Sequence, residues 1–187
     1  MPSGAPASAR ARLDVFHRPA HSAATVKAVG IAPLFVFLAL AWLALLVAAP
    51  LLPPMPAALT YAFGSLICHQ MPERSFYLGT SQLPVCARCL GIYAGVAAGT
   101  IVGRLMRVQM TGAAPRRWLV AGAVPTVVTV AAEWAGVWQT SNIARALAGA
   151  PLGIAVGVVV IGALATLHYD ECTPRPPIAP ARPPRHI

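Results

Sequence analysis

The amino-acid sequence predicts an all-α membrane protein, a polytopic helix bundle of four transmembrane helices plus one short interfacial or re-entrant helix. The first indication is composition: the 187 residues are 57% hydrophobic and only 10% charged, whereas charged residues make up about a quarter of a soluble domain. The second is that four apolar segments approach the roughly 20 residues that a helix needs to cross a bilayer. The third is that glycine recurs at every fourth position in two of these segments, which is typical of closely packed membrane helices.

The four expected spans are placed by their apolar residues. The first covers residues 28–49, and its apolar core is longer than that of a cleavable signal peptide, so we expect an uncleaved anchor. The second covers residues 85–105, the third 118–138 and the fourth 146–167. Trp118 and Trp138 lie at the two ends of the third segment, where interfacial aromatic side chains are common.

A fifth apolar stretch, residues 57–67, follows four prolines and is short for a span. The positive-inside rule tests whether it crosses, because Lys and Arg gather in cytoplasmic loops. Four spans would place eleven basic residues inside and three outside; a fifth crossing would place seven on each side. We therefore expect four spans with both termini in the cytoplasm and, in a bacterium, insertion into the inner membrane. The inside residues are Arg10, Arg12, Arg18, Lys27, Arg104, Arg107, Arg116, Arg117, Arg175, Arg182 and Arg185, and the outside residues are Arg74, Arg88 and Arg145.

This topology divides the chain into three parts. Residues 1–27 form a cytoplasmic segment, residues 28–168 form the membrane bundle with an outer loop at 68–89, and residues 169–187 form a Pro-rich cytoplasmic tail. The composition of the two end segments predicts disorder. The net charge of +9 lies beside apolar segments and forms no basic stripe with interleaved aromatic residues. The expected partner is therefore the lipid bilayer and not nucleic acid.

The outer loop carries most of the chemistry, because it holds Cys68, His69, Cys86 and Cys89. Three thiolates and one imidazole make a complete tetrahedral ligand set for zinc, and thiolates also suit Cu(I). The fourth cysteine, Cys172, falls on the cytoplasmic side in this topology. Because the outer set holds three cysteines, one disulfide would leave one thiol over.

The spacing of the second cysteine pair favours a helix start. Pro84 suits a position just before a helix, and Cys86 and Cys89 then share one helix face. A helix N-terminus lowers thiol pKa values, which helps both metal binding and redox attack. Leu90 follows the pair where the signature of c-type haem attachment has histidine, so that cofactor is excluded.

A polar layer is expected at the outer end of the bundle. Glu133 lies inside the third segment, and an ionisable residue in a span needs a partner. We expect that partner to be Arg88 or Arg145, in a pair that either fixes helix ends together or serves the site. Arg74 and Asn142 complete the set of residues that could support the metal ligands or hold an anion.

Two glycine stripes predict how the helices pack. Because small residues allow close approach of membrane helices, we expect the second and fourth spans to touch along them. A homo-oligomer formed through one stripe is the competing interpretation. The stripes consist of Gly91, Gly95, Gly99 and Gly103 in the second span, and of Gly149, Gly153 and Gly157 in the fourth.

These residues resemble the DUF2085 family of predicted prokaryotic membrane proteins, over roughly half the chain from Cys68 to Gly157. The resemblance implies that Cys68, His69, Arg74, Cys86, Arg88, Cys89, Asn142 and Arg145 form one site. This chain departs from the family at Glu133-Trp134, where members often carry Asp-Gly. The matching elements are Ile67-Cys68-His69-Gln70, Pro72-Glu73-Arg74-Ser75-Phe76, Pro84-Val85-Cys86-Ala87-Arg88-Cys89-Leu90-Gly91-Ile92-Tyr93 with Gly95, and Ser141-Asn142 with Arg145 and Gly149.

Three functions fit the sequence. The first is a metal-binding membrane protein, with zinc as the expected ion and Cu(I) as the other candidate. The second is a membrane thiol–disulfide oxidoreductase, in which Cys86 and Cys89 form the active pair and Cys68 exchanges with it. The absence of a cysteine from the second outer link, residues 139–145, weighs against this function. The third is a non-catalytic scaffold stapled by one disulfide.

Overall fold

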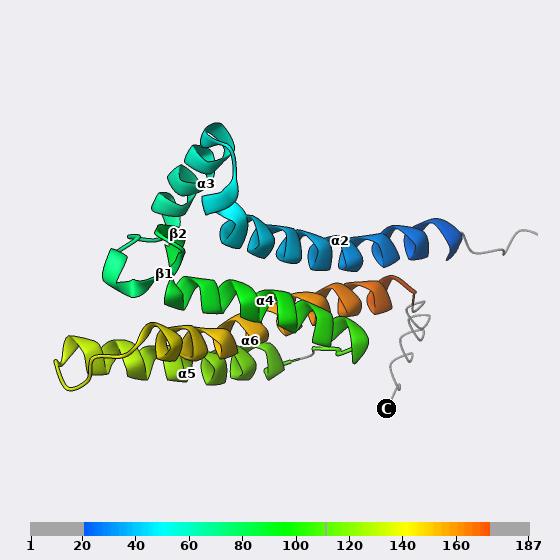
Figure 1. The fold of residues 1–187 in the computed structure, drawn as a ribbon. Coiled ribbons are helices and arrows are strands. Elements are labelled where there is room, and N and C mark those ends of the chain that lie inside the picture. The colour runs from blue at the N-terminus through cyan, green and yellow to red at the C-terminus, as the bar shows by residue number, and fades with distance from the viewer. Residues whose placement is uncertain (1–20, 111, 173–187) are drawn as a thin grey trace, which may run out of the picture.

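The structure is a computed structural model that describes residues 21–110 and 112–172, with side chains described for residues 31–110 and 112–165. The expected segments 1–27 and 169–187 lie largely outside the described residues. The described part is mostly helical, with five α-helices, one two-stranded sheet and short 3-10 turns at Ala49–Leu51 and Pro72–Arg74. In chain order the elements are α2 (His21–Ala48), α3 (Pro54–Ile67), β1 (Ser75–Leu78), β2 (Ser81–Cys86), α4 (Ala87–Leu105), α5 (Ala114–Trp134) and α6 (Asn142–Cys172) (Figure 1).

Two segments of the described chain are long and apolar enough to cross a membrane. They are Ile31–Leu51, in α2 and the turn after it, and Asn142–Ala165, in α6. Helices α4 and α5 overlap the other two expected spans, and their crossing stays a prediction. The short apolar stretch forms α3, which stands apart from the other helices at the hairpin end of the molecule (Figure 1). Its 14 residues rise about 21 Å, less than the roughly 30 Å of a hydrocarbon core.

The sheet is the feature that the all-α expectation omitted. Strands β1 and β2 pair antiparallel, with Ser75 opposite Cys86 and Leu78 opposite Ser81. Gly79 has φ 62° and supplies the left-handed backbone that a tight hairpin turn needs. Cys86 is therefore the last strand residue and α4 begins at Ala87, later than the expected start of the second span. Strand pairing depends on contacts across the turn, which hydropathy along the chain does not report.

Helices α4 and α6 make the most extensive contact in the described structure. Both glycine stripes lie in this contact, because a Cβ added to any of the seven glycines would meet atoms of the facing helix. At six of the seven, the atom met first is a backbone carbonyl oxygen, which cannot move aside as a flexible side chain can. The absence of side chains at these positions therefore sets the distance between the two helices.

The remaining helices pack around this pair. Helix α5 lies along α6, and the Thr126 hydroxyl donates a hydrogen bond to the carbonyl oxygen of Ala148 over 2.7 Å. Helix α2 lies along α4 (Figure 1). Trp42 of α2 meets Tyr93 of α4 and Phe63 of α3 edge-on, with ring centroids 6.0 Å and 5.2 Å apart. These aromatic contacts bring the ends of three helices together beneath the hairpin.

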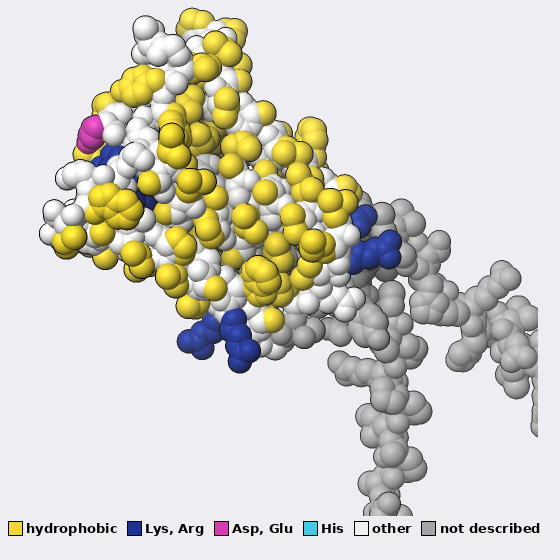
Figure 2. Space-filling model, turned by 60° about the horizontal axis from the view of Figure 1, so that its bottom comes forward, with side chains coloured by type: hydrophobic (Ala, Val, Ile, Leu, Met, Phe, Trp, Pro, Cys, Tyr) yellow, Lys and Arg dark blue, Asp and Glu magenta, His cyan; other side chains and the backbone are white. Residues whose placement is uncertain are grey.

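The surface is dominated by apolar side chains. Figure 2 shows a largely yellow face with basic side chains in blue at its margins. Large hydrophobic residues such as Phe37, Leu59 and Leu66 are 65% to 80% exposed, and apolar patches of this extent are typical of a membrane or binding surface. Arg104 and Arg116 are both exposed at the end of the bundle away from the hairpin, where α4 ends and α5 begins.

Candidate metal centre

The first cysteine marks the end of α3. The backbone becomes extended at Cys68, with φ −147° and ψ 139°, and Pro72 disfavours helix at Met71 before it. Cys68 is only 8% exposed, whereas its neighbour His69 is exposed. The two adjacent residues that the sequence placed in one ligand set therefore differ in burial.

A glutamine holds the turn after Cys68 in place. Gln70 has φ 49°, and its side-chain amide donates to the carbonyl oxygens of Tyr61, over 2.9 Å, and Pro84, over 2.7 Å. The Gln82 amide in turn donates to the Gln70 carbonyl oxygen over 2.7 Å and to the Ser75 hydroxyl over 3.1 Å. These bonds join the end of α3 to strand β2. They therefore align the first cysteine with the strand that ends in the second.

The three cysteines of the outer loop come together at this junction. The sulfur atoms of Cys68, Cys86 and Cys89 all lie within 4.8 Å of one another, and all three residues are free thiols. Two sulfurs on one tetrahedral zinc ion lie about 3.8 Å apart, given a Zn–S distance of about 2.3 Å. The arrangement can therefore hold one metal ion after small adjustments.

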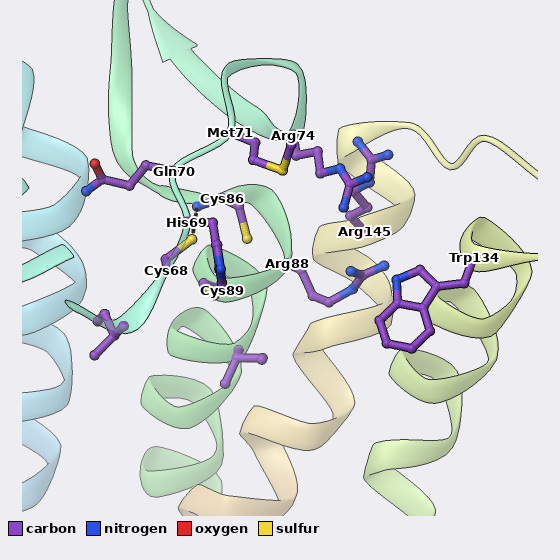
Figure 3. Close-up of a pocket in the computed structure, with 12 residues that line it drawn as sticks. Cys68, His69, Gln70, Met71, Arg74, Cys86, Arg88, Cys89, Trp134 and Arg145 are labelled. Carbon is purple, nitrogen blue, oxygen red and sulfur yellow. Dashed lines mark hydrogen bonds between the residues drawn. The ribbon is translucent and has the colours of Figure 1, made fainter. Parts of the chain in front are cut away.

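His69 lies at the edge of this group and does not belong to it. Its ring nitrogens fall outside the set of ligand atoms that share the 4.8 Å spacing, although the residue lines the same cavity. Figure 3 shows its ring beside the cysteine side chains. The structure thus brings together three of the four ligands expected from the sequence.

Hydrogen bonding favours a thiolate at Cys86. The Cys89 thiol donates to the Cys86 sulfur and holds the pKa of Cys86 well below its usual value, although burial opposes this shift. Further hydrogen bonds from Cys68 and from the backbone of Arg88 and Cys89 act in the same direction. A thiolate is the form that binds a metal or attacks a disulfide. The lowered pKa therefore favours the reactive form of Cys86 near neutral pH.

A buried ion-pair network lies next to the cysteines. The Glu133 side chain is only 6% exposed, and its Oε1 accepts hydrogen bonds from Arg145 Nε over 2.9 Å and Arg88 Nη2 over 3.4 Å. Arg88 also donates to the Thr129 hydroxyl over 3.3 Å. The sequence left Arg88 and Arg145 as alternative partners of Glu133, and in the structure one carboxylate oxygen of Glu133 pairs with both.

The same network reaches the hairpin through Asn142, at the start of α6. Asn142 accepts a hydrogen bond from Arg145 Nη1 over 3.0 Å and donates its amide to the Ser75 carbonyl oxygen over 3.0 Å. Arg145 also donates to the carbonyl oxygen of Glu73 over 3.4 Å. These hydrogen bonds therefore connect Asn142 and Arg145 of α6 to the hairpin and to the turn before it.

The three cysteines and two arginines of the network, Arg88 and Arg145, line one cavity of about 430 Å³. Figure 3 shows the cysteine side chains on one side of it and Arg74, Arg88 and Arg145 on the other. Arg74, from the turn before β1, is half-buried. The cavity thus combines soft metal ligands with cationic hydrogen-bond donors.

Several residues that shape the site have no role expected from the sequence. Gln70 follows Cys68 and His69 in the Cys-His-Gln element of the resemblance, and this position beside two candidate ligands could have marked it as a residue of the site. Thr129 precedes Glu133 by one helical turn, a spacing that places both on one face of α5. Gln82 and Trp134, which pin the turn and line the cavity respectively, had no comparable local signal.

Comparisons with known proteins identify the family of this chain. The family model described as "Predicted membrane protein (DUF2085)" matches residues 68–159, from the first cysteine through most of α6. An uncharacterized protein of Methanocaldococcus jannaschii is 37% identical over 112 residues, which cover 59% of this chain and 72% of that protein. An uncharacterized protein of Methanothermobacter thermautotrophicus is 33% identical over 93 residues, covering 50% and 83% respectively. No solved structure matches at a significant level. The chain belongs to the DUF2085 family of predicted membrane proteins.

Proposed function

We propose that this protein is an integral membrane protein that binds a zinc ion through the thiolates of Cys68, Cys86 and Cys89. The observation that carries the proposal is the convergence of three free thiols, from a turn, a strand end and a helix start, within 4.8 Å. Three protein ligands leave one position of a tetrahedral ion open, as in zinc sites that bind an exchangeable ligand. The adjoining cavity gives that position access to solvent.

The proposed topology has four spans, cytoplasmic termini and the cysteine site on the outer face. It is supported by the distribution of Lys and Arg, with eleven on the inner side and three on the outer side. Exposed basic residues at the far end of the bundle, among them Arg104 and Arg116, agree with that orientation. In a bacterium the site would face the periplasm, where a metal ion also protects thiolates from oxidation.

A thiol–disulfide oxidoreductase is the second candidate, and the lowered pKa of Cys86 favours it. A disulfide uses two cysteines, however, and the grouping of three thiols leaves the third without a role inside the resting site. Zinc uses all three. A scaffold stapled by one disulfide would likewise leave the third thiol of the group without a role.

The test is to measure metals and free thiols on one sample of the full chain, purified in mild detergent without chelator or reductant. The expected result is about one zinc per chain, lost in Cys86→Ser and retained in Cys172→Ser, the matched control at the cysteine expected on the other face. Copper in place of zinc would correct the identity of the ion. A metal-free protein that lacks two thiols until reductant is added would reject the metal site and support a disulfide.

A further inference from the structure

The cavity beside the cysteine group has two chemically different sides. Sulfur atoms line one, and the guanidinium groups of Arg74, Arg88 and Arg145 line the other (Figure 3). No Asp or Glu is among the described residues that line it. Within the described part of the chain, the only carboxylate that forms an ion pair with these arginines is that of Glu133, which pairs with Arg88 and Arg145. The space between the two sides therefore faces positive charge.

The charges leave an excess of one positive unit when zinc is bound. Three thiolates around one Zn²⁺ carry a net charge of minus one, and Glu133 contributes another negative charge. The arginines contribute three positive charges. Because the side chains of Arg88, Arg145 and Glu133 are largely buried and uncompensated buried charge is costly, one negatively charged ligand would balance the site. Cu(I) in the same position would leave no such excess.

Two arginines also have unused donors. The Nε atom of Arg88 is buried without a hydrogen-bond partner in the described structure. Arg74 makes no ion pair there, and its only hydrogen bond in that part of the chain comes from its backbone N–H to Met71. A buried donor without a partner destabilises the protein. The site thus has hydrogen bonds to offer in addition to charge.

We infer that this cavity binds the oxyanion group of an organic ligand, a carboxylate or a phosphate, between the arginines and the open position of the metal ion. The inference rests on the proposed zinc site. An anionic oxygen is an ordinary fourth ligand of zinc, and a guanidinium group binds carboxylate and phosphate oxygens in a matching geometry. The ligand is larger than a lone ion, because a volume of about 430 Å³ is typical of pockets for small organic molecules.

Replacing zinc with Co²⁺ tests whether an anion reaches the open metal position, because the visible absorption bands of Co²⁺ change when its fourth ligand changes. The full chain in neutral detergent is loaded with Co²⁺ and titrated with acetate and with inorganic phosphate. The test variant is Arg74→Gln, which leaves the Glu133 pairs intact. The matched control is Arg104→Gln, at an exposed arginine of α4 far from the hairpin.

The expected result is a saturable change in the Co²⁺ spectrum for the unaltered chain and for Arg104→Gln. In Arg74→Gln the anion should bind at least about tenfold more weakly, as expected for the loss of one charge-assisted hydrogen bond, while Co²⁺ affinity is unchanged. If Co²⁺ binds but its spectrum changes neither with acetate or phosphate nor with phosphatidic acid, the anion site is overturned and the metal site stands. Failure to bind Co²⁺ at all would overturn the metal site, and the anion site with it.

A final comparison identifies the source of the oxyanion. The Co²⁺ protein is placed in nanodiscs of phosphatidylcholine alone or with added phosphatidic acid, without soluble anions. A spectral change with phosphatidic acid supports the inference and assigns the site to a lipid headgroup. A change that needs dissolved acetate or phosphate supports it equally and assigns the site to a water-soluble ligand.

Discussion

The backbone N–H of Cys86 donates a hydrogen bond to the sulfur of Cys68 over 3.2 Å, although the two cysteines belong to different elements. The bond joins the end of α3 to the end of β2, directly before α4. The geometry of the cysteine group therefore depends on this junction and not only on the short Cys-x-x-Cys spacing.

Removing the exposed imidazole should leave the metal site intact. We expect His69→Ala to retain about one zinc per chain and an unchanged Co²⁺ spectrum, because His69 lies outside the group of three sulfurs. Cys89→Ala, a truncation inside the group, should lose the metal. Metal content and the Co²⁺ spectrum of both variants provide the measurement. A loss of affinity in His69→Ala as severe as in Cys89→Ala would make the imidazole a ligand.

The turn after Cys68 should control metal affinity without supplying a ligand. In Gln70→Glu, a negative carboxylate replaces the amide that donates to the carbonyl oxygens of Tyr61 and Pro84, so these bonds are lost. We expect zinc affinity to fall about 10- to 100-fold, the usual effect of disturbing groups that orient metal ligands. Competition with a chelator measures this. Gln139→Glu, the same change at an exposed residue, is the control, and equal affinities in the two variants would contradict the role of Gln70.

Glu133 should be essential for the stability of the end of the bundle that carries the hairpin. Glu133→Gln removes the charge that compensates Arg88 and Arg145 and leaves two buried cations together. Breaking a buried ion pair in this way costs about 3–5 kcal/mol, so thermal unfolding in detergent should occur at a clearly lower temperature. Glu73→Gln makes the same substitution at an exposed carboxylate and should change the unfolding temperature little. Indistinguishable variants would show that the network is not structural.

We expect Gly153 and Gly103, two glycines of the contact between α4 and α6, to differ in their tolerance of an added methyl group. In Gly153→Ala the new Cβ would meet the carbonyl oxygen of Ile92 and the backbone of Val96, which cannot move aside. In Gly103→Ala it would meet the Cβ of Ile161 at 3.2 Å and the Cα of Val158 at 3.3 Å, contacts that are tight but longer than those at Gly153. We expect a loss of stability of about 1–3 kcal/mol in Gly153→Ala and a smaller one in Gly103→Ala, measured by thermal unfolding. The reverse order would mean that α4 and α6 pack differently.

Hydropathy located the helices well, because the tendency of an apolar segment to form a helix in a membrane is encoded along the chain. Each of the five described helices overlaps an apolar segment found in the sequence. The same approach missed the hairpin, because the pairing of Ser75 with Cys86 depends on the turn at Gly79 bringing two short polar and apolar runs together. It also placed Cys86 inside a span, whereas the structure has it at the end of a strand.

The composition of the site was largely visible in the sequence, and its geometry was not. Cys68, Cys86 and Cys89 are candidates by residue type and spacing alone, and so is Glu133 by its isolation in an apolar segment. Which candidate ligand atoms come together depends on the tertiary structure: the sulfur atoms of Cys68, Cys86 and Cys89 lie within 4.8 Å of one another, and the ring nitrogens of His69 are not part of that group.

The sequence by itself determined the membrane class, the positions of the helices and the identity of the chemical groups, because composition and hydropathy act locally along the chain. Tertiary structure decided which of those groups meet. It brought a third thiol to the pair at the start of α4 and gave one carboxylate oxygen of Glu133 to two arginines. The physical reason is that these contacts join residues from separate elements, and their distances depend on the close approach of α4 to α6 and of α3 to β2.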